Sequence, residues 1–396
     1  MLVLASSALP LAAAQAQSFE FLGENLAEGT LVRTSIEAGL TYTDNFFYTT
    51  QAAPQQEAVG WLLRPGAALT RSLSRVSYGF GANAEIAGFD VPSSVDDYQD
   101  YRLGGAINWQ PASRHQLTFG PTLLWDHDPF GRERTENTPL ENRELDKWRQ
   151  VRGDARYRIG LPADRFNYEL LVTALDKRYT SNRNFTQYLD YSSTTEDFLV
   201  TYNYSPKTAA LINIVATQTD YDKIFPGAFD RSADEIRYLV GARWTATGKT
   251  SGDVRVGYAK RKSNDASRND FSGLDWRAGV SWTPVAYRGI SASIGRSSQE
   301  SYFNNVKFIN NYYYSLQWTE DWTVRFRTLL NLSYIDTDYV GSSRSDQHFT
   351  ADFEGQYRLN RSLKVLARIG QNQRDSNFNV VDFDRLNVYV GFALSR

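Results

Sequence analysis

Large apolar and polar residues alternate along short segments of the chain with a period of two. In residues 275–284, Trp276, Val280 and Trp282 fall on one side of an extended backbone, whereas Arg277 falls on the other. Strict alternation of this kind predicts a β-strand with two chemically different faces. Helical periodicity is almost absent, so we expect an all-β protein.

Short alternating segments of this type follow one another along nearly the whole chain, and we count eighteen. Their predicted spans are 31–48, 58–71, 75–90, 97–110, 115–128, 147–161, 166–180, 192–205, 208–222, 234–246, 251–264, 271–283, 287–301, 307–319, 322–338, 346–359, 362–376 and 383–395.

The connections between the segments alternate between short and long. The short ones are rich in turn residues and lie at 73–75, 111–114, 162–165, 205–207, 247–250, 284–286, 320–321 and 360–361. The long ones are more polar, for example 129–146, 181–191 and 224–233. This order predicts an up-and-down antiparallel transmembrane β-barrel of about 18 strands in an outer membrane, with short turns in the periplasm and long loops outside. No motif repeats at a fixed spacing, which disfavours a propeller or a β-helix.

The positions of the aromatic residues distinguish a membrane barrel from a water-soluble β-sandwich. Five of them stand at strand ends, immediately before short turns, and would lie at one height. Amphipathic rings favour the membrane interface, so they predict a girdle on the periplasmic side. The girdle residues are Trp109, Tyr204, Trp244, Trp282 and Trp318.

The opposite face of the strands carries charged residues, which a barrel would turn toward its lumen. Eighteen strands enclose more space than side chains alone can fill, so we expect a water channel or a lumen blocked by loops. The charges either steer acidic sugars or anions, or pair across strands and stabilise the wall. The lumen candidates are Arg102, Arg152, Asp154, Arg156, Arg237, Arg243, Asp275, Arg277, Arg325, Arg327 and Arg368.

Other candidate chemistry is sparse. The aromatic residues Tyr48, Tyr302, Phe303 and Tyr313 could stack on sugar rings or pack loops onto the barrel. The three histidines show no spacing that requires a metal, and the sequence around His127 fits a solvated loop end better than a catalytic pair. We therefore expect no catalytic residue, no metal and no cofactor.

Composition and the first residues bear on localisation. The chain has 396 residues, a net charge of −2 and no cysteine, so nothing indicates nucleic-acid binding, thiolate metal sites or disulfides. Small and apolar residues followed by Ala14-Gln15-Ala16 predict a signal peptide at 1–16. A short periplasmic stub at 17–30 and the outer-membrane barrel at 31–396 would follow.

Three stretches resemble the family of putative β-barrel porins of the second type. They are IEAGLTYTDNF at 36–46, LVTYNYSP at 199–206 and YVGF at 389–392. The last contains Phe392, a candidate for the aromatic signal that the barrel assembly machinery reads. The family is often associated with exopolysaccharide biosynthesis, so the resemblance implies polymer export across the outer membrane together with periplasmic export proteins.

The predicted function is therefore that of a non-enzymatic exopolysaccharide channel in the outer membrane of a Gram-negative bacterium, in contact with membrane lipid and lipopolysaccharide. One alternative is a general diffusion porin for small polar solutes. Another, from a different class, is an outer-membrane hydrolase or a structural adhesion barrel.

Overall fold

A computed structural model describes residues 24–27, 29–50, 53–91, 97–129, 144–265, 268, 270–299, 306 and 308–396. The predicted signal peptide and part of the predicted stub lie outside the described residues, so both assignments stay predictions. Within the described residues no helix has the length and apolar character needed to cross a membrane.

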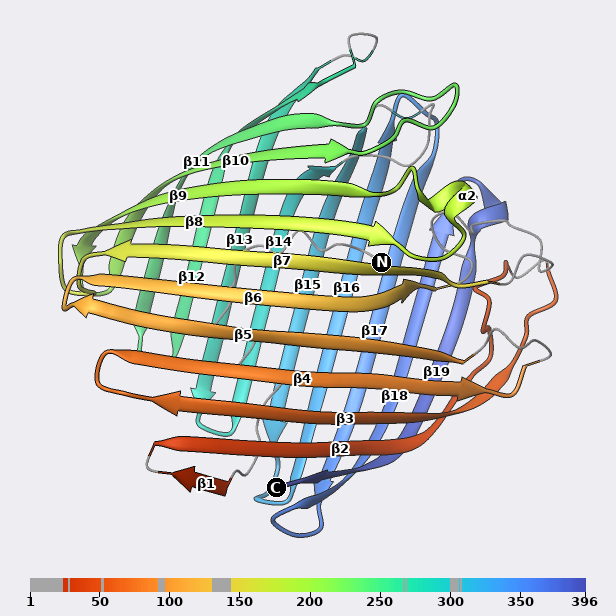
Figure 1. Cartoon of the computed structure of the whole chain (residues 1–396), viewed down its shortest axis with the longest axis horizontal. Helices are drawn as coiled ribbons and strands as arrows, with labels where there is room; N and C mark the ends of the chain where they lie inside the picture. Colours follow the sequence, from red (N-terminus) through yellow and green to blue (C-terminus); the bar gives the residue numbers. More distant parts are fainter. Residues whose placement is uncertain are drawn as a thin grey trace.

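The chain forms a closed antiparallel barrel of the strands β2–β19, with a short additional strand β1 (Figure 1). The bounds are β1 Glu24–Ala27, β2 Thr30–Thr43, β3 Ala58–Ser72, β4 Val76–Phe89, β5 Tyr98–Ala112, β6 His115–Asp128, β7 Asp146–Ile159, β8 Phe166–Tyr179, β9 Tyr191–Ser205, β10 Thr208–Tyr221, β11 Ala233–Thr247, β12 Thr250–Ser263, β13 Phe271–Val285, β14 Arg288–Gln299, β15 Phe308–Asp321, β16 Phe326–Val340, β17 Ser345–Arg358, β18 Leu363–Ser376 and β19 Phe383–Ser395.

The barrel closes where the last strand meets the first strand of the wall. β19 pairs with β2 from Asn387↔Thr43 to Ser395↔Ser35, so the first residues of β2 lack a partner on that side. β1 pairs with these residues, from Thr30 to Val32. Closure leaves the long strands without an open edge, as a backbone in lipid requires. The predicted barrel of about 18 strands is confirmed.

Short turns join the strands at one end of the barrel and longer connections join them at the other (Figure 1). At one turn the prediction is wrong, because β15 runs on through Asp321 and the chain reverses at 322–325. The Thr323 hydroxyl accepts the backbone N–H groups of Arg325 and Phe326 at 3.1 and 3.0 Å, which fixes this turn. Val324, which sequence alternation places on the lipid face, is instead a turn residue that is 89% exposed.

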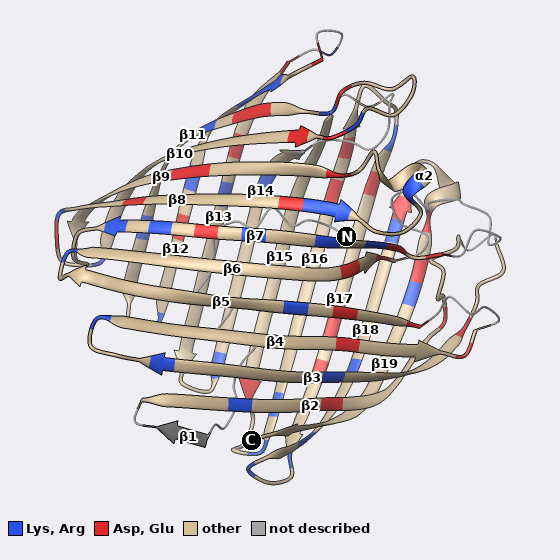
Figure 2. Ribbon diagram, in the orientation of Figure 1, with Lys and Arg blue, Asp and Glu red and all other residues tan. Residues whose placement is uncertain are grey.

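The registers align the side chains of each face into rows around the wall. In one outer row, Ile212 lies opposite Val240, and Val240 lies opposite Val256. These three side chains are 56, 58 and 44% exposed, as expected for a surface that meets lipid. Bands of Lys and Arg and bands of Asp and Glu lie side by side along several strands, and they are closely spaced on β7 (Figure 2).

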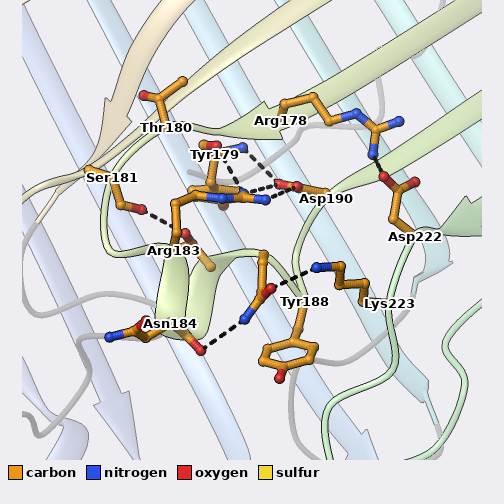
Figure 3. Close-up of polar contacts among 12 residues, drawn as sticks. Arg178, Tyr179, Thr180, Ser181, Arg183, Asn184, Tyr188, Asp190, Asp222 and Lys223 are labelled. Carbon is orange, nitrogen blue, oxygen red and sulfur yellow. Dashed lines mark hydrogen bonds and ion pairs between the residues drawn. The ribbon is translucent and has the colours of Figure 1, made fainter.

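The connection between β8 and β9 carries the helix α2, Arg183–Thr186, at the long-loop end of the barrel (Figure 1). Arg183 pairs with the buried Asp190, with Nη2 2.7 Å from Oδ2, and the Tyr179 backbone N–H donates to the same carboxylate at 2.8 Å (Figure 3). The bond to Asp190 raises the pKa of the Arg183 guanidinium. Arg178, near the end of β8, pairs with Asp222, which directly follows β10.

Candidate functional site: the inner wall of the barrel

Side-chain contacts that skip a strand identify the inner face. Arg368 on β18 reaches Glu37 on β2 across β19, and Arg255 on β12 reaches Asn213 on β10 across β11. Strands two apart in a sheet are separated by about 10 Å, so such contacts form readily only where side chains converge on a concave surface. The face that carries these residues is therefore the lumen wall, and the opposite face, with its exposed apolar residues, meets lipid.

An ion network lies on the inner wall where the barrel closes. Glu37 accepts hydrogen bonds from Arg64 and Arg368, each with an Nη1–Oε1 distance of 2.7 Å. Arg64 Nε also lies 2.7 Å from Glu85, and Arg368 pairs with Glu354 as well. Five charged groups on five strands of the wall thus form one network across the seam, the place where β19 meets β2. Here the charges pair across strands and stabilise the wall, which is one of the two roles that the sequence left open.

A second group of ion pairs lies on β7 and β8. Arg152 Nη2 is 2.8 Å from Asp154, which also accepts the Thr173 hydroxyl at 2.6 Å. Arg156 and Arg158 share Glu169 on the neighbouring strand, at 3.5 and 2.6 Å. Alternation on β7 therefore brings three arginines to one face, where Asp154 on the same strand and Glu169 on β8 balance part of their charge.

A third group lies on β10–β13. Arg237 pairs with Glu235 and lies 3.7 Å from Asp275, and Arg255 Nε lies 3.0 Å from Asp253. Arg277, directly opposite Arg255, makes only a 3.4 Å hydrogen bond to Asn213 Oδ1 among the described residues. This part of the wall therefore contains an arginine without a carboxylate partner.

The remaining lumen candidates differ in their positions. Arg102 and Arg243 lie on the inward face, and no ion pair forms at either within the described part of the chain. Arg327 pairs with Asp321 near the short-turn end. The assignment of Arg325 to the strand wall is wrong, because Arg325 lies exposed in the turn before β16. Its backbone C=O accepts the N–H of Arg358 at 2.8 Å.

The predicted girdle residues occupy the outer face beside the short turns. Trp109, Tyr204 and Trp282 are 45, 80 and 46% exposed. Trp244 lies opposite Thr208, the first residue of β10, and Trp318 lies opposite Ile290 near the start of β14. Their contact with a membrane interface stays a prediction, although the position fits it.

Two further exposed aromatic residues lie at the same end of the barrel but were not assigned to the girdle, because the girdle was drawn only from residues that precede a predicted short turn and these two follow one. Trp322 and Tyr287 are 55 and 52% exposed, and the Trp322 ring meets the Trp318 ring edge-on at 6.1 Å between centroids. A proximity rule, in which an aromatic within four residues of a girdle tryptophan joins the girdle, would have found Trp322.

An uncharged polar stretch of the inner wall was also missed. Ser281 and Ser291 hydroxyls lie 3.0 Å apart, and Ser293 and Ser315 hydroxyls lie 2.6 Å apart, so β13–β15 present a ladder of hydroxyl groups. In the sequence, the serines at the alternate positions 291 and 293 indicate this polar stretch, but small residues do not distinguish the inner face from the outer one clearly.

The two remaining predictions concern His127 and the aromatic residues Tyr302 and Phe303. His127 is not at a solvated loop end: its side chain is 13% exposed, its Nδ1 lies 3.0 Å from Asp100, and the Tyr98 ring packs on it at 4.3 Å. With Asp100 and Asp126 it forms a group whose ligand atoms all lie within 4.8 Å of one another, a spacing that a metal ion could use. Tyr302 and Phe303 lie outside the described residues.

A closed 18-stranded barrel with an apolar outer face and a charged inner wall defines an outer-membrane channel protein of the porin type. The chain matches the family model "Putative beta-barrel porin 2" over residues 28–396 and belongs to that family. The bacterial outer membrane is therefore its location. No curated protein matches the chain.

Solved structures with a similar fold are outer-membrane proteins of low sequence identity. A BenF-like porin from Pseudomonas fluorescens Pf-5 and OccK9 (OpdG) from Pseudomonas aeruginosa each share 11% identity, with a TM-score of 0.50, over 94% of this chain and 100% of theirs. The FrpB iron transporter from Neisseria meningitidis (F3-3 variant) shares 10% identity, with a TM-score of 0.46, over 87% of this chain. The matched region spans 62% of the length of that transporter.

Proposed function

We propose that this barrel is a passive, water-filled channel for small polar solutes. The observation that carries the proposal is the inner wall, where ion pairs and a ladder of hydroxyl groups offer polar partners over many strands. A barrel of 16–18 strands encloses an aqueous channel when no segment fills it. The porins of similar fold support the same function.

Export of an exopolysaccharide, which the family resemblance suggested first, is the competing proposal, together with its periplasmic partners. The porins of similar fold favour small solutes instead, so we place diffusion first. An enzymatic role is not proposed, because the family and these structures are channels.

Reconstitution distinguishes the proposals. The purified chain in planar bilayers should give stepwise conductance in KCl, and vesicles containing it should swell in disaccharide but not in long dextran. Absence of conductance steps would contradict the diffusion channel. Loss of secreted polymer on gene deletion, with no effect on the uptake of small solutes, would favour export.

A further inference from the structure

Two arginines face each other directly in the lumen. Arg255 on β12 and Arg277 on β13 are cross-strand partners, and both point inward. Like charges at directly opposite positions destabilise a sheet. Their juxtaposition is therefore a feature that stability alone does not favour, and stability is often given up at sites that bind ligands.

The two guanidinium groups have unequal partners. Arg255 donates from Nε to Asp253 at 3.0 Å and from Nη1 to Asn213 at 2.7 Å. Arg277 has only the long contact to Asn213, 3.4 Å from its Nη2, and no ion pair within the part of the chain that the structure describes. Most donors of Arg277 are therefore free to bind an anion in the lumen.

A tyrosine lies beside this free guanidinium. The row through Arg277 continues to Gly295 on β14 and then to Tyr313 on β15. A side chain at Gly295 would collide with the hydroxyl end of the Tyr313 ring, so the ring leans across β14 toward β13. Tyr313 is half-buried, and its hydroxyl has no hydrogen bond among the described residues.

The site lies midway along the inner wall of the barrel. Arg277 is near the middle of β13, which runs from Phe271 to Val285. The same row contains Gly241 on the other side of Arg255, so small residues flank the arginine pair on both sides. The row thus combines positive charge, free donors and an aromatic face halfway through the barrel.

We propose that Arg277 and Tyr313, with Arg255 beside them, form a binding site for small solutes that carry a carboxylate on a ring. The carboxylate accepts hydrogen bonds from Arg277, whose planar donor geometry matches it, and its charge offsets the repulsion between the two arginines. The ring packs against Tyr313. This site rests on the proposed channel function and names the class of solute that the channel prefers.

Titration calorimetry on the full chain in detergent tests the site independently of conductance. The probes are benzoate and its neutral analogue benzamide. Benzoate should bind the unaltered protein more tightly than benzamide does. Arg277→Gln should raise the Kd of benzoate about tenfold, as expected for the loss of a charged hydrogen bond. The matched control is Arg102→Gln, which removes an inward arginine without an ion pair from β5 and should change the Kd by less than about twofold.

Two further measurements separate a binding site from general wall charge and from a structural role. Tyr313→Leu removes the aromatic ring, so it should weaken benzoate binding. Because it leaves the net charge unchanged, the reversal potential in a KCl gradient should stay the same. Arg277→Gln relieves the like-charge pair, so resistance to urea unfolding should stay the same or rise.

The outcomes are separable. Equal binding of benzoate and benzamide, or an equal loss in Arg102→Gln and Arg277→Gln, overturns the site even if the channel conducts. A large drop in urea resistance of Arg277→Gln shows a structural arginine and also overturns it. Benzoate binding without conductance steps would leave the site in place and contradict only the proposed channel.

Discussion

Arg368 Nη1 lies 2.7 Å from Glu37 Oε1, although the two residues are 331 positions apart in the sequence. The contact crosses β19, so it joins the next-to-last strand to the first strand of the wall at the point of closure. Glu37 holds a second arginine, Arg64, at the same distance. This carboxylate is therefore the centre of the network that ties the ends of the barrel together.

Replacing Glu37 with glutamine should weaken the closed barrel. Two arginines would lose their shared carboxylate in a part of the wall where Glu37 is 17% exposed. We expect the free energy of unfolding to fall by about 1.5–3 kcal/mol, the range for hydrogen bonds to charged groups. Urea titration in lipid vesicles, followed by tryptophan fluorescence, measures it.

The control for this prediction is the pair of Arg114 and Asp164 at the short-turn end, where Arg114 is 63% exposed. Exposed pairs contribute less than about 1 kcal/mol, so Arg114→Gln should change little. A stability of Glu37→Gln equal to that of the unaltered protein would show that the seam does not depend on this carboxylate.

Glycine at position 39 should be required for the seam to pack. Gly39 on β2 lies opposite Gly391 on β19, and a Cβ there would collide with the Val390 C=O and the Tyr389 ring. Gly39→Ala should therefore lower both the yield of refolding and the stability, because backbone at the closing pair would have to shift.

The matched control for Gly39 is Gly153 on β7, where nothing lies within 4 Å of an added Cβ. Gly153→Ala should be neutral or slightly stabilising, because it only restricts the unfolded chain. Heat-dependent mobility on gels, which separates folded from unfolded barrels, compares the two variants. Equal behaviour of both would contradict tight packing at the seam.

An arginine introduced on the outer face should be costly. Val240 on β11 is 58% exposed in the middle of an apolar row, which we assign to lipid. Val240→Arg should reduce the stability by about 2–4 kcal/mol in a bilayer, the cost of this residue near the midplane. Gln317→Arg, on the inward face of β15, should cost far less because it stays in water. Similar losses in both variants, measured by urea titration in vesicles, would show that the faces are assigned wrongly.

Local alternation was sufficient to predict the strands but not their contacts. All eighteen predicted segments correspond to strands, because period-two patterns with turn residues between them are local properties. The turn at 322–325 was misplaced because Trp322 and Val324 continue the apolar pattern, whereas the Thr323 hydroxyl closes the turn.

The candidate site was predicted only in outline. Parity assigned Arg277 to the lumen, yet its direct opposition to Arg255 depends on the register between β12 and β13, which alternation does not specify. His127 illustrates the same limit. Its side chain contacts Asp100, which is 27 positions away, and at the end of β6 the strict alternation of faces no longer predicts where the side chain lies. The ion pairs across the seam could not be predicted from alternation either, because they form only when the barrel closes and β2 lies beside β19.

The two faces of β13 provide the most direct test of a lipid-facing outer wall around a wet lumen. The chain has no cysteine, so single cysteines at Val280 and Ser281 can carry spin labels without background labelling. In vesicles, the label at 280 should respond mainly to oxygen, which concentrates in lipid, and the label at 281 mainly to a water-soluble nickel complex. Equal accessibility to both reagents at the two adjacent positions would contradict a membrane barrel with an aqueous interior.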